Sequence, residues 1–265
     1  MANADMSYLL PLFELAGSLE DEATVSFGLG EPDADSSLAR DNDETKTKGY
    51  WVSHVIDQAI TAAVDHGIAL RDLVGSGRVT HAAPWTILRG VLEPAALAVW
   101  VLNGSTRKHR QERALRVWCH DYTERGTWER DVGEIIVPPA KSGGARVSEI
   151  VAVAKSLDLR PTQVSTRLSY ADIVADAGEV VGWKRGIATA RWRESSGFAH
   201  GRYWPLMRLG RPQAAERIRG GFTAALGLGE EHHREVAALA TALLERALTD
   251  WAKAAAPESS TVGGR

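Results

Sequence analysis

The chain has 265 residues, of which 44% are hydrophobic and 25% are charged, and its formal net charge is −3. This composition is typical of a globular protein, and the charge excludes a global positive field, so any site for a polyanion must be a local patch. The single cysteine, Cys119, excludes an internal disulfide and a cluster of thiolate metal ligands.

The N-terminal sequence MANADMSYLLPLFELAG predicts a short helix and lacks the basic residues of a signal peptide. No apolar run approaches membrane-spanning length, so we predict a cytoplasmic protein that contacts no membrane. Residues 27–47 are acidic, polar and rich in turn formers, which predicts a flexible segment. We therefore expect residues 1–47 to form an N-terminal helical extension.

The rest of the chain predicts an all-α bundle over residues 48–256, followed by a disordered tail over 257–265. Apolar residues recur every three or four positions in several segments, and the connections between them are short. The glycine-rich segment 201–229 predicts loop with short pieces of structure, and no segment has a convincing two-residue period of a strand. The expected helices cover residues 51–74, 84–102, 106–128, 146–157, 170–200 and 230–256, and Gly182 or Gly186 is expected to interrupt the helix over 170–200.

The sequence RWRESSGFAH places Arg193 and His200 seven residues apart, which puts both side chains on one face of a helix. Arginine binds phosphate through a fork of donors, and histidine transfers protons near neutral pH. Together they could support attack of an RNA 2′-hydroxyl on the adjacent phosphate without a metal. The structural alternative is a pair that hydrogen-bonds buried carbonyls and closes a packed helix pair.

This stretch resembles the R-x(4–6)-H signature of the HEPN superfamily, and ILRGVLEPAALAVWVL resembles the R-x3-E helix of HEPN-like bacterial proteins that also carry an S-x3-H element. The resemblance implies a compact helical bundle. It also implies a metal-independent endoribonuclease of a toxin or defence system, which acts on RNA as a homodimer without a cofactor. Arg193 would bind phosphate and His200 would be the general acid or base.

The same resemblance makes Ser196, Arg89 and Glu93 candidate supporting residues. Arg89 and Glu93 lie four residues apart, so they form either an intrahelical ion pair or a means for Glu93 to orient Arg193 or His200. Glu194 departs from the family pattern, because it follows the motif arginine and brings negative charge beside the expected phosphate site. Gly197 could also interrupt the helix between Arg193 and His200.

The helix expected over 106–128 carries a basic stripe, in which Arg107, His109, Arg113 and Arg116 are the candidate nucleic-acid contacts. Cations at helical spacing can follow a phosphate backbone. A solvated helix face without a partner is the competing interpretation.

Residues 148–168 resemble a helix-turn-helix, with Asp158 at the turn position and Gln163 and Arg167 among the exposed residues that would read DNA. A DNA-binding regulator is therefore one alternative function, and a non-catalytic helical interaction protein is another. We predict no metal site, because His232 and His233 are adjacent on a helix and no HExxH or paired CxxC motif is present.

Overall fold

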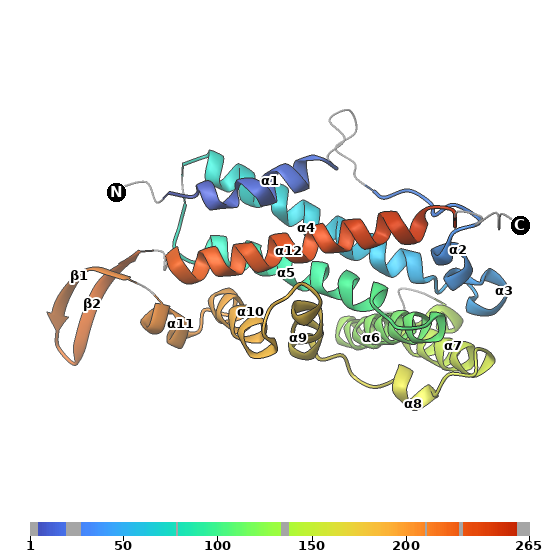
Figure 1. Cartoon of the computed structure of the whole chain (residues 1–265). Helices are drawn as coiled ribbons and strands as arrows, with labels where there is room; N and C mark the ends of the chain where they lie inside the picture. Colours follow the sequence, from blue (N-terminus) through green and yellow to red (C-terminus); the bar gives the residue numbers. More distant parts are fainter. Residues whose placement is uncertain are drawn as a thin grey trace, which may run out of the picture. The chain divides into compact units, whose positions relative to one another are not determined.

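The computed structural model of the protein describes residues 5–19, 28–77, 79–133, 138–209, 211–227 and 230–258, and most of them are helical (Figure 1). The predicted all-α class is confirmed. Within these residues the strands form a single antiparallel hairpin of β1 (Arg211–Ile218) and β2 (Gly221–Gly227). This hairpin lies in the segment that the sequence predicted as loop, because its alanine-rich strands lack an alternation of apolar and polar residues.

The chain forms two compact units, each built from three separate stretches. The first unit contains Met1–Gly28, Ala59–Val99 and Tyr170–Leu248, and the second contains Leu29–Gln58, Trp100–Ser169 and Thr249–Arg265. By these bounds, three helices contribute residues to both units: α4 (Val52–Gly75), α5 (Ala83–Leu102) and α12 (Glu230–Ala255).

The first unit contains the Arg193–His200 stretch. Besides its portions of α4, α5 and α12, it contains η1 (Ser7–Leu9), α1 (Leu10–Gly17), α9 (Tyr170–Val180), α10 (Arg185–Ala199), α11 (Tyr203–Leu209) and the hairpin. Buried Trp85 of α5 stacks on Phe198 of α10 with ring centroids 4.6 Å apart. It also meets the edge of His233 of α12 at 5.1 Å. These aromatic contacts hold α5, α10 and α12 together.

His233 is fully buried and shares a hydrogen bond between its Nδ1 atom and the Tyr8 hydroxyl, which attaches η1 to α12. Burial lowers the pKa of His233 from 6.5 to about 3. The unfolded chain therefore binds a proton below pH 6.5 that the folded chain does not bind until about pH 3. Above pH 6.5 the folded state pays no such penalty, and stability falls as the pH drops through this window.

We expect His233 to reduce the free energy of unfolding by about 1.4 kcal/mol for each pH unit below 6.5. Urea denaturation between pH 7.5 and pH 4.5 measures this slope. His233→Asn keeps a hydrogen-bonding group near the Tyr8 hydroxyl and removes the titration, so its slope should be shallower than that of the wild type. Equal slopes for the two proteins would contradict the assignment.

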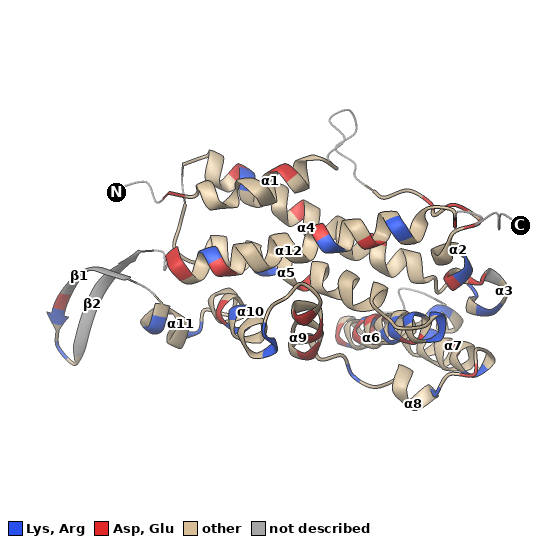
Figure 2. Ribbon diagram, viewed as in Figure 1, with Lys and Arg blue, Asp and Glu red and all other residues tan. Residues whose placement is uncertain are grey.

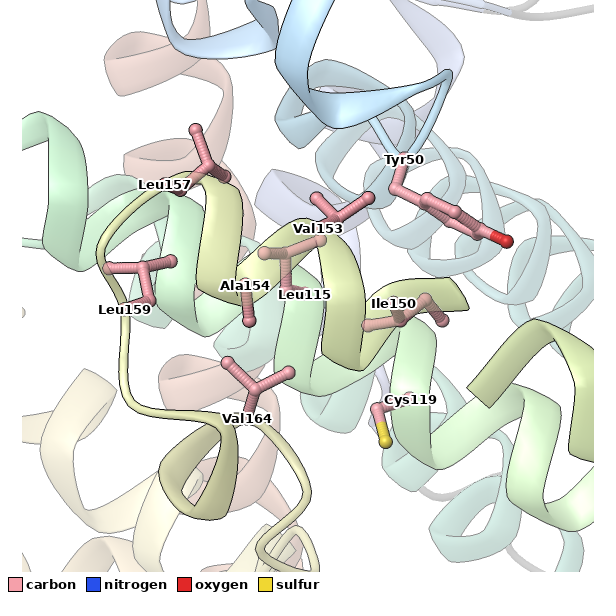
Figure 3. Packing of buried hydrophobic residues seen from close by; sticks show 9 residues of the cluster. All are labelled: Tyr50, Leu115, Cys119, Ile150, Val153, Ala154, Leu157, Leu159 and Val164. Carbon is pink, nitrogen blue, oxygen red and sulfur yellow. The ribbon is translucent and has the colours of Figure 1, made fainter. Parts of the chain in front are cut away.

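The second unit contains α2 (Ser37–Asn42), α3 (Glu44–Thr47), α6 (Arg107–Val132), η2 (Pro139–Lys141), α7 (Gly143–Ser156) and α8 (Pro161–Val164). Its core cluster joins α6, α7 and α8 and includes Leu115, Ile150 and Val164, which are at most 1% exposed (Figure 3). Tyr50 closes one side of this cluster and donates a hydrogen bond of 2.7 Å to Glu149.

Residues 37–47, part of the segment predicted to be flexible, are largely helical. The Ser36 hydroxyl caps α2 by accepting a hydrogen bond from the Ala39 N–H. The carboxylate of Asp41 is buried and binds the Arg110 guanidinium at 2.9 Å. The polar residues that suggested disorder therefore act as helix caps and as partners of α6.

The predicted disordered tail over 257–265 also begins with residues in defined contacts. Pro257 forms a β-bridge with Ser36, and Glu258 forms an ion pair with Arg40. Residues 259–265 lie outside the described part of the chain.

Helix α5 corrects the expectation that no apolar run approaches membrane-spanning length. Among the described helices it is the one whose length and composition would suit a membrane span, and 61% of its most apolar window is buried within the protein. Leu88, Val91 and Leu92 are fully buried. The apolar character of α5 therefore matches its place in the core of the protein.

Candidate functional site

Helix α10 presents Arg193 and His200 in the register that the sequence predicted. The helix is continuous from Arg185 to Ala199, and His200 is its C-cap residue, with its N–H bonded to the Ser196 carbonyl at 3.1 Å. The concern that Gly197 would interrupt the helix is therefore unfounded. Seven residues correspond to nearly two turns and about 10 Å along the axis, so both side chains would have to extend toward each other to bind one phosphate.

Arg193 and His200 are both exposed. With respect to the residues that the structure describes, neither side chain makes a hydrogen bond or an ion pair. The Arg193 guanidinium lies 5.7 Å from the centre of the neighbouring Trp192 ring. The donors of Arg193 and the ring nitrogens of His200 are therefore available to a ligand.

Glu194 faces away from this pair. Its side chain is 10% exposed and forms an ion pair with Arg191, which also binds Glu235 of α12. The Nδ1 atom of His232 lies 3.3 Å from the same Glu194 carboxylate. The Glu194 carboxylate is thus buried and paired with Arg191 within the first unit.

Glu93 is linked to α10 through Trp192. Its carboxylate accepts a hydrogen bond from Arg89 at 2.8 Å and another from the indole N–H of Trp192. Glu93 thus orients Trp192, the ring beside Arg193, and no hydrogen bond to Arg193 or His200 is found within the described residues. The pair is thus the intrahelical ion pair of the first interpretation, and a role of Glu93 in orienting Arg193 or His200 stays a prediction.

Ser196 is half-buried on α10, one turn before His200, and its carbonyl accepts the His200 N–H. The neighbouring Ser195 is fully buried, and its hydroxyl donates to the carbonyls of Arg191 and Trp192. Ser195 therefore has a structural role, whereas the supporting role of Ser196 stays a prediction.

Helix α11 places exposed aromatic side chains directly after His200. A Cβ atom on Gly197 would lie 2.4 Å from Pro205 and 3.3 Å from the Trp204 ring, so the glycine allows α11 to pack on α10. Tyr203 remains 71% exposed and Trp204 45% exposed. Gly197 is therefore covered by α11 of the same chain.

Basic residues, marked in blue on the ribbon of Figure 2, lie on α10 and α11. Residues 200–219 contain five arginines and a single acidic residue, Glu216. Arg202 and Arg208 are exposed beside Tyr203 and Trp204. The sequence HGRYWPLMRLGR already interleaves basic and aromatic residues, although it lies in the segment predicted to be loop with short pieces of structure.

The basic stripe on α6 belongs to the second unit. Arg107 lies 3.9 Å from Asp41 and 3.7 Å from Asp43. The Nδ1 atom of His109 is 3.3 Å from the Ser105 hydroxyl, and burial, together with a neighbouring arginine, lowers the pKa of His109. Arg107 and His109 therefore make contacts with neighbouring residues at the N-terminal end of α6.

The other two candidates of the stripe also bind the protein itself. Arg113 donates to the Trp100 carbonyl and stacks at 4.7 Å from the centre of that ring. Arg116 donates to the carbonyls of Thr166 and Arg167 at 3.1 and 3.0 Å. A role of Arg107, His109, Arg113 and Arg116 in nucleic-acid binding stays a prediction, and phosphate would have to replace these internal bonds.

The helix-turn-helix pattern corresponds to α7 and α8. Asp158 adopts the expected left-handed conformation, with φ 55°, and Val164 and Leu168 are buried. Gln163 and Arg167 are exposed, but α8 has only four residues. A recognition helix must extend across a major groove, and a single turn does not do so.

Nothing in the described ranges suggests a metal centre, since no group of three or more histidine, cysteine or acidic side chains converges there. Burial raises the pKa of the Cys119 thiol, which therefore does not resemble an activated nucleophile. Comparison of the chain with protein-family models, curated proteins and solved structures finds no match. The functional assignment therefore depends on side-chain chemistry.

Proposed function

We propose that the protein is a HEPN-like, metal-independent endoribonuclease whose site lies at the C-terminal end of α10. One observation favours a nuclease over a purely structural Arg–His pair. A structural Arg–His pair would hydrogen-bond buried carbonyls, whereas the exposed side chains of Arg193 and His200 make no hydrogen bond to any described residue. Exposed polar groups without an internal partner are suited to bind a ligand.

In the proposed reaction, Arg193 binds a non-bridging phosphate oxygen and His200 accepts the proton of the RNA 2′-hydroxyl. The 2′-oxygen then attacks phosphorus, and the bond to the 5′-oxygen of the next nucleotide breaks. The leaving oxygen takes up a proton from solvent or from a second protonated histidine. The products are a 2′,3′-cyclic phosphate and a 5′-hydroxyl, and no metal ion enters the balance.

The substrate class follows from α11. Aromatic side chains bind unpaired bases by stacking, and neighbouring cations bind the backbone. Tyr203 and Trp204 supply exposed rings, while Arg202 and Arg208 supply charge. Single-stranded RNA therefore suits this surface better than a duplex, and a local patch of this kind is compatible with the net charge of −3.

The HEPN-like resemblance extends the proposal to the biological setting. It suggests a homodimer that acts in the cytoplasm as part of a toxin or defence system. A second copy would bring another Arg193 and His200 to the same phosphate, which supplies the proton donor that one copy lacks.

The proposal is tested by incubating the full-length protein with single-stranded RNA in excess chelator. A matched RNA with 2′-O-methyl groups serves as the control, because it binds the same surface but lacks the nucleophile. We expect cleavage of the first RNA and none of the second. Equal cleavage of both would contradict the 2′-hydroxyl mechanism, and intact RNA in both samples would contradict catalysis.

A non-catalytic interaction protein is the second candidate, and it rests on the same α11 surface. Tyr203, Trp204 and Met207 expose 71%, 45% and 44% of their surface, and aromatic residues and methionine are common at protein interfaces. If RNA is neither cleaved nor bound, this candidate replaces the nuclease.

A further inference from the structure

A cavity of about 500 Å³ lies within the second unit, separate from the residues of the proposed nuclease site. Its walls come from the stretch before α2, from α2, from the first turns of α4 and from the last turns of α12. The side chains that carry the inference are Glu31, Asn42, Trp51, His54, Asp57 and Trp251. The volume is in the range of pockets that bind small organic molecules.

The polar part of the wall is held in place by hydrogen bonds. Asn42 donates to the Ser53 hydroxyl at 2.9 Å and accepts the Ser53 N–H at 3.0 Å, and both residues are buried. The Asp57 Oδ1 atom accepts the Leu29 N–H at 3.1 Å, which ties the stretch before α2 to α4. The cavity is therefore built before any ligand binds.

The carboxylates that line the cavity face no lysine or arginine of the lining. Glu31 and Asp57 contribute these carboxylates. Asp57 is half-buried, and its Oδ2 atom has no partner among the described residues. An anionic ligand would be repelled, whereas a cation would supply the missing partner.

Two tryptophan rings form part of the remaining wall, together with Gly30, Pro32, Ala34 and Ala39. Trp251 is buried, and Trp51 lies against His54 with ring centroids 4.6 Å apart. The faces of indole rings attract organic cations. A bare metal ion fits less well, because Glu31, His54 and Asp57 belong to no converging group of metal ligands in the described chain.

We propose that this cavity binds a small organic cation, with an ammonium or guanidinium group held between the tryptophan rings and the carboxylates of Asp57 and Glu31. The inference is independent of the proposed nuclease activity. The expected ligands carry a positive charge and are otherwise compact and either apolar or planar.

The test is calorimetric titration of the full-length protein with choline, agmatine and spermidine, and with acetate and adenosine monophosphate as anionic controls. At least one cation should bind with a Kd below about 1 mM, and the anions should not bind. Asp57→Asn keeps an acceptor for the Leu29 N–H and removes the charge, so it should weaken binding about tenfold. Trp51→Phe should also weaken binding.

Asp35→Asn is the matched control, because Asp35 is an exposed carboxylate on the same stretch and does not line the cavity. It should bind the cation as the wild type does. Failure of all three cations, binding of an anion, or an equal loss of affinity in Asp35→Asn and Asp57→Asn would overturn the proposal. Thermal unfolding of each variant confirms that it is folded.

Discussion

Replacing His200 by alanine is expected to slow RNA cleavage by about 100-fold to 10,000-fold, the usual contribution of a general acid or base. Arg193→Ala should slow it by about 100-fold to 1,000-fold, because the charge that develops on the phosphate loses its donor. Initial rates with a labelled single-stranded RNA in excess chelator give both values.

The same variants should keep the stability of the wild type. Both side chains are exposed, and surface substitutions of this kind change stability by about 0.5 kcal/mol or less. Lys184→Ala is the matched control, since Lys184 is an exposed cation at the opposite end of α10. Unchanged cleavage in His200→Ala would contradict the nuclease. Lowered melting temperatures with an inert wild type would indicate a structural pair.

Gly143→Ala is expected to reduce the free energy of unfolding by about 2 to 4 kcal/mol, the cost of forcing a side chain into a filled contact. A Cβ atom at residue 143 would lie 2.5 Å from the Gly126 nitrogen and 2.5 Å from the Tyr122 carbonyl oxygen. Both are backbone atoms of α6 and cannot rotate away. The substitution therefore separates α6 from α7, which share the core cluster of the second unit.

Gly144→Ala provides the comparison, because a Cβ atom at residue 144 has no neighbour within 4 Å among the described residues. This variant should match the wild type or gain up to about 1 kcal/mol, since alanine restricts the unfolded chain more than glycine does. Urea denaturation followed by circular dichroism distinguishes the two. Equal losses in both variants would mean that α6 and α7 do not approach as closely as described.

Helix positions were the part of the fold that could be predicted from the sequence, because apolar residues recur at helical spacing along the long helices. The 3–4 spacing from Trp51 corresponds to α4, and Ile56, Ile60 and Val64 are almost fully buried. The expected break near Gly182 also occurs, with φ 84° at that glycine. These features depend on local pattern and backbone freedom alone.

The features that could not be predicted depend on tertiary contacts. The polar composition of 27–47 favoured disorder. The burial of Asp41 in this segment depends on Arg110, a residue 69 positions away, and could not be seen from the composition. Glu194 looked like an obstacle to phosphate binding because its burial, and the ion pair that its partner Arg191 also forms with Glu235 of α12, could not be assigned from spacing. The cavity beside Trp51 and Trp251 could not be foreseen for the same reason.

The candidate site was predicted in part. The seven-residue spacing indicated that Arg193 and His200 share a face, which the continuous helix α10 supports. Tyr203 and Trp204 were missed, because exposed aromatics in a glycine-rich segment show no helical period. The packing of Pro205 and the Trp204 ring on Gly197, which places α11 against α10, is visible only in three dimensions.

The most direct test of the proposed nuclease is to identify the new RNA ends that the wild-type protein produces in excess chelator. Treatment of the products with acid and phosphatase, followed by mass spectrometry, distinguishes the possible ends. Attack by the 2′-hydroxyl predicts a 2′,3′-cyclic phosphate on one fragment and a 5′-hydroxyl on the other. A 3′-hydroxyl paired with a 5′-phosphate, or RNA that stays intact, would contradict the role assigned to Arg193 and His200.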